Sequence, residues 1–177
     1  MVEEFVNTLD LELGTDELAD AEALAEWLAG RGLVSVASPV TTTDLARAAQ
    51  LREALRAILM AHGGEPEDAA AIAVLDRVAA EARLVPRFQG SGSYRLQPAE
   101  AGVSGALGRI VAAVLEGIDD GTWERLKACR NDGCRWAFYD ASRNRSGAWC
   151  RMAVCGNRMK VRAYRRRRQE GLERTRR

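Results

Sequence analysis

The sequence predicts a mainly α-helical protein. It has a helical N-terminal domain that contains a small β-hairpin, and a small C-terminal module that is organised around cysteines and ends in a basic helix. Apolar residues recur every three or four positions through most of residues 1–128, which is the spacing of amphipathic helices. All four cysteines lie within residues 129–177. The charge divides at the same point, because residues 1–128 hold 11 basic and 21 acidic side chains, whereas residues 129–177 hold 15 basic and 4 acidic ones.

Five helices are expected in the N-terminal domain. Their apolar periodicity places them at residues 2–13, 21–28, 43–61, 66–83 and 99–118. Asp16 or Asp20 suits the N-cap of the second helix and Thr43 that of the third, because these short polar side chains accept hydrogen bonds from free backbone amides. The Gly63–Gly64 pair should end the third helix. The residues of the fourth helix expected to face inward are Ile72, Leu75, Val78 and Ala79.

The periodicity changes between the fourth and fifth helices. Residues 84–88 and 94–96 predict two short strands around the glycine-rich turn that begins at Gly90. A domain of about 120 residues is large enough to bury a core. We interpret residues 1–128 as one helical domain with this hairpin inserted. Our hypothesis is that it senses a small-molecule effector or mediates homodimerisation.

The cysteines form two matched pairs. Four residues separate Cys129 from Cys134, four separate Cys150 from Cys155, and 15 residues lie between the pairs. This set predicts a tetrahedral four-cysteine site for one structural Zn²⁺. Four protein ligands leave no open coordination position, so catalysis by this ion is not expected. The alternatives are two disulfides or four unrelated thiols, and the matched spacing in a chain expected in a reducing cytosol favours zinc.

The cysteine module is expected to be treble-clef-like. Residues 135–140 predict one strand of a hairpin with Trp149 on the returning strand, and a helix should follow Cys155. The last ligand would then lie at a helix N-terminus, where the dipole favours thiolate. A segment of about 50 residues buries too little surface to fold alone, so bound zinc would supply on the order of 10 kcal/mol.

The residues around the cysteines resemble a known family. The run Cys155-Gly156-Asn157-Arg158 is similar to the motif for which the CGNR zinc-finger family is named, and Cys129 to Asp140 resembles the first half of that finger. The N-terminal part resembles the domain usually paired with it, called ABATE, at Phe5-Val-Asn-Thr-Leu, Leu24-Ala-Glu-Trp-Leu and Leu51-Arg-Glu-Ala-Leu-Arg. The resemblance implies a bacterial protein of a group described as stress-related transcription regulators. It also implies that the four cysteines bind zinc.

The helix expected over residues 157–169 is strongly basic. Arg158, Arg162, Arg165 and Gln169 share one face, because they follow one another at helical spacing. Met159, Val161 and Tyr164 are expected to pack back on the zinc module. A basic helix of this kind can enter a major groove or follow a phosphate backbone. The candidate nucleic-acid-binding residues are therefore Arg151, Arg158, Lys160, Arg162, Arg165, Arg166 and Arg168.

Three functions compete for these arginines. They can contact nucleic acid, DNA in the first place; they can dock on acidic protein surfaces, within the chain or between chains; or they can form a solvated tail. These functions differ in one observable: whether Arg158, Arg162 and Arg165 are free or are paired with acids of the N-terminal domain. We interpret the chain as a transcription regulator that binds nucleic acid through its zinc module. The main alternative is a zinc-stabilised protein-interaction module without nucleic-acid binding.

Several other classes of protein are not expected. The longest apolar run is seven residues, whereas a membrane-spanning helix needs about 20. The acidic N-terminus does not resemble a secretory signal, so we expect a cytoplasmic protein without membrane contact. No nucleophile, phosphate-loop or zinc-protease motif occurs. The single histidine, His62, is interpreted as a residue at a helix C-terminus, and we expect no enzyme activity.

Overall fold

The computed structural model describes residues 1–35, 38–90 and 92–175, with side chains up to residue 169; Ser91 of the expected glycine turn lies outside this part. The helical elements are α1 (Val2–Val6), α2 (Ala21–Gly30), α3 (Thr42–His62), α4 (Ala69–Glu81), α5 (Gly102–Asp119), η1 (Trp123–Arg125), η2 (Met152–Gly156) and α6 (Asn157–Thr175). The strands form three antiparallel pairs: β1 (Leu9–Asp10) with β2 (Thr15–Asp16), β3 (Leu84–Gln89) with β4 (Ser93–Pro98), and β5 (Leu126–Ala128) with β6 (Ala137–Tyr139). The expected mainly helical class, with one longer hairpin and a terminal helix, is confirmed.

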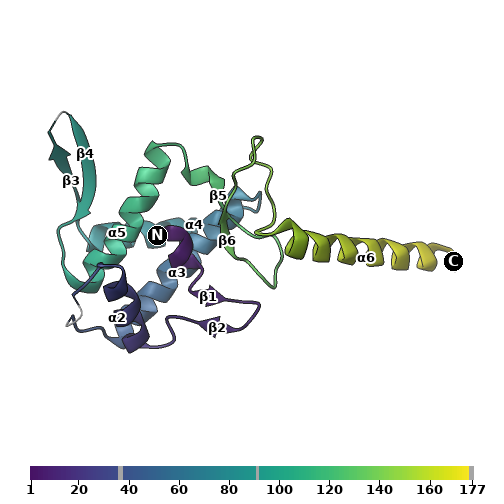
Figure 1. Cartoon of the computed structure of the whole chain (residues 1–177), viewed down its shortest axis with the longest axis horizontal. Coiled ribbons are helices and arrows are strands. Elements are labelled where there is room, and N and C mark those ends of the chain that lie inside the picture. Colours follow the sequence, from purple (N-terminus) through teal and green to yellow (C-terminus); the bar gives the residue numbers. More distant parts are fainter. Residues whose placement is uncertain (36–37, 91, 176–177) are drawn as a thin grey trace.

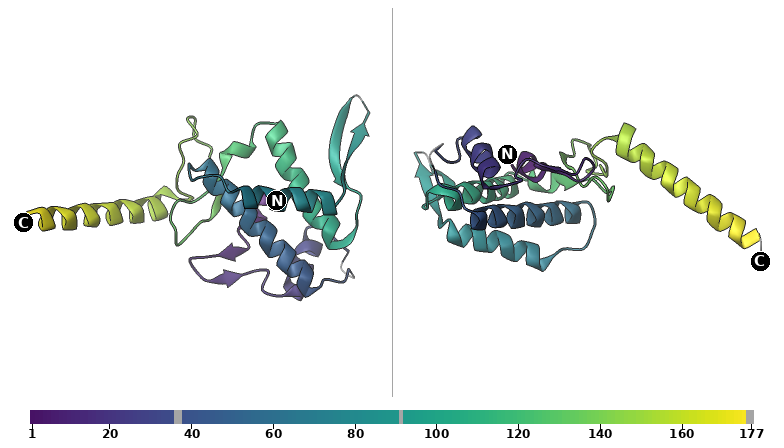
Figure 2. Two further views of the ribbon diagram at one scale, coloured as in Figure 1. Left: turned by 180° about the vertical axis from the view of Figure 1, so that it is seen from behind. Right: turned by 90° about the horizontal axis from the view of Figure 1, so that it is seen from below.

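The core of the protein forms around α3. Its fully buried Leu51, Leu55 and Leu59 pack with α1, α2, α4 and α5 in one hydrophobic cluster, and Leu107 and Ile110 of α5 belong to the same cluster. Figures 1 and 2 show two parts that extend beyond this body. The β3–β4 hairpin rises at one end, and α6 projects from the opposite end.

The first helix is shorter than the sequence predicts. Helix α1 ends at Val6, and Leu13, expected on an apolar face, is 75% exposed. The chain turns because side chains take over the backbone hydrogen bonds that a helix would use. Thr8 Oγ1 donates to the carbonyl of Phe5, and the buried guanidinium of Arg56 donates to the carbonyl of Val6. The prediction of a helix over 2–13 is therefore wrong after its first turn and a half.

The remaining helix boundaries follow capping chemistry. Asp20 accepts from the Ala23 amide at 2.9 Å, as predicted for the second helix. The third helix begins slightly earlier than expected, because Thr41 rather than Thr43 forms a reciprocal capping box with Asp44. The fourth helix starts after Asp68, and Ile72, expected to face inward, is 46% exposed. The expected hairpin and the fifth helix are confirmed.

The base of the β3–β4 hairpin packs tightly on α5. A Cβ added at Gly108 would overlap the Ala82 Cβ and would lie 3.3 Å from the Pro98 Cβ. Gly108 is therefore required by close approach, because only a residue without a side chain lets Ala82, at the end of α4, and the hairpin base beside it lie this near α5. This contact positions the β3–β4 hairpin relative to the core.

We expect Gly108→Ala to destabilise the protein by about 2 kcal/mol, because the added methyl group overpacks a rigid contact. Chemical denaturation followed by circular dichroism measures the change. Gly117→Ala in the same helix is the matched control: its Cβ would meet neighbours only at 3.5 Å or more, and helix propensity predicts a gain of up to about 1 kcal/mol. Equal effects of the two substitutions would contradict the close approach at Gly108.

Candidate metal centre and basic helix

Four cysteines from separate parts of the C-terminal segment meet at one point. Cys129 follows β5, Cys134 precedes β6, Cys150 ends the long loop after β6, and Cys155 lies in η2. Their Sγ atoms all lie within 4.8 Å of one another. Cys129, Cys134 and Cys155 are buried, and Cys150 is partly exposed. The predicted ligand set is thus brought together completely.

The distances between the sulfur atoms fit a metal site. Cys134 Sγ lies 3.7 Å from Cys150 Sγ, which in turn lies 3.8 Å from Cys155 Sγ. A tetrahedron with Zn–S bonds of about 2.3 Å has edges of about 3.8 Å, whereas a disulfide needs about 2.05 Å. Burial raises the pKa of the Cys134 thiol to about 11, so four adjacent thiolates are stable only beside a cation. The site is that of one structural zinc.

A tight turn places the first ligand pair. The amides of Cys134 and Arg135 both donate to the carbonyl of Asn131, and Arg135 adopts a left-handed conformation with φ of 51°. The buried Asn131 side chain donates from Nδ2 to Cys155 Sγ at 3.6 Å. Burial opposes the thiolate of Cys155, but hydrogen bonds from Asn131 and the neighbouring thiols outweigh it and lower the pKa of Cys155. Asn131 therefore stabilises thiolate charge as well as shaping the turn.

The hairpin of the module differs from the expected one. We predicted a strand over 135–140 that pairs with a return through Trp149. Instead, β6 pairs with β5, and Ala128 lies opposite Ala137. The segment before Trp149 contacts the first cysteine pair in another way: the amide of Arg130 donates to the carbonyl of Ala148 at 3.0 Å. The prediction failed because the pairing strand precedes the cysteines and lacks a strand-like pattern of its own.

The last ligand lies where the sequence predicts, at the beginning of the final helix. Gly156 is buried, and a Cβ there would overlap Met152 Sδ and would lie 3.1 Å from Trp149 Cδ1. Asn157 Nδ2 donates to the carbonyl of Ala153 at 3.1 Å. Both residues thus join η2 to α6, so the metal centre fixes where the basic helix starts.

A buried ion pair organises the loop between β6 and Cys150. Lys127 Nζ lies 2.8 Å from Asp140 Oδ2, and both side chains are at least nine-tenths buried. Asp140 also accepts from the amides of Ser142 and Gly147. Burial opposes the charged form of this carboxyl, but these hydrogen bonds hold its pKa well below the ordinary value. Sequence reasoning missed this pair, because nothing in the spacing of one lysine and one aspartate indicates burial.

Several side chains of the N-terminal domain attach the zinc module to it. Asn7 accepts from the Ala137 amide at 2.7 Å and donates to the Ala137 carbonyl at 3.0 Å. Arg56, buried in α3, donates to the Arg135 carbonyl at 2.9 Å. His62 Nδ1 lies 2.8 Å from the carbonyl of Leu126 and its ring packs edge-on against Trp123, so it is a packing residue at the end of α3. These contacts hold β6 and β5 against the core.

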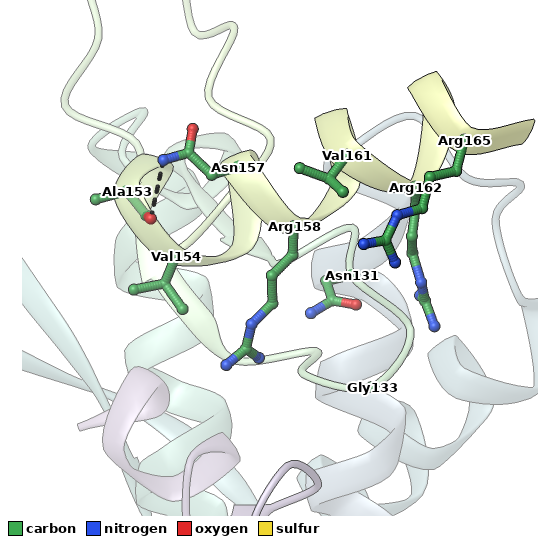
Figure 3. Close-up of a pocket in the computed structure, with 9 residues that line it drawn as sticks. All are labelled: Asn131, Gly133, Ala153, Val154, Asn157, Arg158, Val161, Arg162 and Arg165. Carbon is green, nitrogen blue, oxygen red and sulfur yellow. Dashed lines mark hydrogen bonds between the residues drawn. The ribbon is translucent and has the colours of Figure 1, made fainter. Parts of the chain in front are cut away.

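The arginines of α6 gather on one side near its start. Figure 3 shows Arg158, Arg162 and Arg165 on the same side of the helix, above the turn at Asn131 and Gly133. They line a cavity of about 670 Å³, which also has Val154 and Val161 in its wall. Arg151 lines a different cavity, of about 440 Å³, together with Glu12 and Cys134. Lys160, Arg166 and Arg168 are exposed on α6 without lining either cavity.

Of the three apolar residues of α6 expected to pack on the zinc module, Met159 is half-buried but Val161 and Tyr164 are exposed. Val161 is 48% exposed and Tyr164 is 61% exposed. The prediction that they pack on the zinc module is wrong, because the helix extends away from that module after its first turn (Figure 1). Most of α6 is therefore supported only at its N-terminal end.

One arginine of the basic face is paired with the N-terminal domain. Arg158 Nη1 lies 2.6 Å from Glu12 Oε1, on the loop between β1 and β2. Both side chains are more than one third exposed, so solvent screens the pair and it contributes little to stability. Within the described part of the chain, Arg162 and Arg165 form no ion pair. The basic face is thus only partly neutralised within the chain.

A helical domain joined to a four-cysteine metal site and a basic helix defines a zinc-finger protein. Residues 1–121 match the ABATE family, described as "Putative stress-induced transcription regulator", and residues 125–168 match the CGNR zinc finger. The chain belongs to the ABATE family and carries a CGNR zinc finger after that domain. No curated protein matches the chain closely enough to be named as a relative. None of the described helices has the length and apolar character needed to cross a membrane.

We expect Cys150→Ser to lose most of its zinc, because a hydroxyl does not replace the fourth thiolate. The zinc content measured by mass spectrometry should fall below one ion per chain, and circular dichroism should show loss of structure in the module. Ser146→Ala, an exposed substitution in the preceding loop, should retain one zinc. Full zinc content and an unchanged spectrum in Cys150→Ser would remove Cys150 from the ligand set.

We expect Asp140→Asn to destabilise the protein by about 3 kcal/mol at pH 7, because it leaves Lys127 charged and buried. A lowered pKa means that the carboxylate stabilises the fold above its unfolded pKa of about 3.9, and that this contribution is lost as the pH falls below it. The difference between the variant and the wild type in denaturant midpoint should therefore narrow below about pH 4.

Glu124→Gln is the control for Asp140→Asn, because its partner Arg145 and Glu124 itself are about half exposed or more. It should change stability by less than about 1 kcal/mol. If Glu124→Gln lost as much stability as Asp140→Asn, burial would not be the cause of the destabilisation by Asp140→Asn.

Proposed function

We propose that the protein is a transcription regulator that binds duplex DNA through the zinc-anchored helix α6. The observation that carries this proposal is the exposed basic face at the start of α6, where Arg162 and Arg165 have no acidic partner in the described structure. Phosphate is the partner that several guanidinium groups on one face would bind most strongly. The description of the family as transcription regulators supports the same function.

The dimensions of α6 suit a DNA groove. Its 19 residues correspond to about 28 Å, and an α-helix fits the width of the major groove. The helix stands clear of the body for most of its length (Figures 1 and 2), so a duplex can approach it without meeting the N-terminal domain. The cavity below Arg158, Arg162 and Arg165 would then accommodate a stretch of the sugar–phosphate backbone.

Zinc serves this proposal by fixing the start of the helix. Cys155 and the buried Gly156 tie α6 to the metal centre, and Arg158 follows two residues later. Four thiolates complete the coordination of the ion, so we assign it a structural role and propose no enzyme activity. The N-terminal domain, in this proposal, positions the finger and carries the regulatory input.

The Arg158–Glu12 pair supports a second candidate function, in which the basic helix docks on acidic protein surfaces. It is the one ion pair between α6 and the N-terminal domain among the described residues. A single exposed pair is weak, however, and a phosphate group can replace Glu12 at little cost. The two unpaired arginines therefore favour nucleic acid over an internal dock.

Binding of the zinc-loaded protein to labelled duplex DNA, measured by fluorescence anisotropy at several salt concentrations, tests the proposal. We expect the affinity to fall with salt. In an Arg162→Ala/Arg165→Ala variant the slope of log K against log salt should become shallower by about one per lost phosphate contact. Arg77→Ala/Arg83→Ala, which removes two arginines from the N-terminal domain, is the matched control and should keep the slope.

Two results would overturn the proposal. Absence of binding at low salt would favour the docking function. An equal loss of DNA affinity in the α6 variant and in the control would show that α6 is not the contact surface. A preference for single-stranded RNA over duplex DNA would retain the basic face and change the class of nucleic acid.

A further inference from the structure

The β3–β4 hairpin carries positive charge that no described acid neutralises. Residues 84–98 hold two arginines and no acidic side chain, whereas the rest of residues 1–128 holds 9 basic and 21 acidic ones. The strand register places Arg87 directly opposite Arg95, and both residues are exposed. Neither side chain forms an ion pair or a hydrogen bond with another residue that the structure describes. Like charges directly opposite each other destabilise a hairpin, so a bound anion would stabilise this one.

Arg95 lines a cavity between β4 and α5. The cavity has a volume of about 310 Å³, and its β4 wall includes Gln97 as well as Arg95. These two residues alternate along the strand, so their side chains lie on one face of the hairpin. Ligand sites in proteins have volumes from about 300 Å³ upward, so the cavity has room for a small molecule.

Helix α5 provides the other wall of this cavity. The residues that line it from α5 follow helical spacing and share one face of the helix: Arg109, Ala112, Ala113 and Glu116. The two alanines are small and leave the space between the charged residues open. Arg109 Nη1 donates to the carbonyl of Gly32 at 3.1 Å, which positions its guanidinium group. That group has further N–H donors, and within the described part of the chain it forms no ion pair.

The charges of the cavity match a dianion. Arg95 and Arg109 contribute two guanidinium groups with free donors. A phosphate monoester carries about two negative charges at pH 7 and accepts paired hydrogen bonds from guanidinium groups. Glu116 lies about two helical turns, or about 10 Å, along α5 from Arg109. Its carboxylate repels a second anionic group there and accepts hydrogen bonds from a hydroxyl or an amino group.

We propose that the cavity between β4 and α5 binds a small phosphorylated molecule, with its phosphate between Arg95 and Arg109 and its hydroxyl or amino groups toward Glu116. The ligand joins the projecting hairpin to α5 and offsets the repulsion between Arg95 and Arg87. The wall of the cavity consists only of residues from the N-terminal domain, and the hairpin lies at the end of the molecule opposite α6 (Figure 1). The site is therefore separate from the zinc centre and from DNA binding by α6.

Isothermal titration calorimetry of the full, zinc-loaded chain with glycerol phosphate, in the absence of nucleic acid, tests the proposal. We expect saturable binding. Arg95→Gln should weaken it at least about tenfold, because it removes one of the two guanidinium groups. Glu116→Gln should strengthen the binding of inorganic phosphate, since it removes a negative charge from the same wall. Arg83→Gln is the matched control: the Arg83 side chain is 70% exposed and lies outside the cavity, so salt should screen its effect to within about twofold.

Because Arg95 is exposed, Arg95→Gln should keep the thermal unfolding midpoint of the free protein. Arg109→Lys, which keeps the charge and loses the paired donors, gives a second test if Arg95→Gln is unstable. Absence of binding at millimolar glycerol phosphate would overturn the proposal. So would equal losses in Arg95→Gln and Arg83→Gln, or tighter binding of succinate, a dicarboxylate. Binding that is lost in Arg162→Ala/Arg165→Ala and kept in Arg95→Gln would place the phosphate on α6 instead.

Discussion

The coordination of one cation by four thiolates is the constraint on which the C-terminal part of the protein depends. Burial alone would keep at least one of these thiols protonated. All four are therefore stable as thiolates only when a metal ion compensates their charge. The ion then replaces the hydrophobic core that a segment of this size cannot form. It also decides where α6 begins, because Cys155 is both a ligand and part of the last turn before the helix.

The module is also held by the N-terminal domain. Asn7 and Arg56 donate or accept hydrogen bonds at the backbone of Arg135 and Ala137, and these contacts satisfy polar groups that the short β5–β6 pair leaves unpaired. Arg56 serves two roles, since it also ends α1 at Val6. The same buried guanidinium thus ends α1 and holds the zinc module against the N-terminal domain.

Two parts of the molecule project from opposite ends of its body (Figure 1). The metal centre supports a basic helix at one end, and α5 supports the β3–β4 hairpin at the other (Figure 1). A close approach at a glycine lies at the base of each projection, at Gly156 for α6 and at Gly108 for the β3–β4 hairpin.

The sequence by itself determined the metal ligands, the mainly helical class and the basic face of α6. Cysteine spacing and helical periodicity are local patterns that can be recognised without knowledge of the fold. Only the tertiary structure decided that α1 stops at Val6, that β5 pairs with β6, and that Lys127 meets Asp140. Each of these depends on hydrogen bonds between residues separated along the chain, such as Arg56 with Val6. Burial of a charged side chain is decided by its partner and leaves no periodic signal of its own.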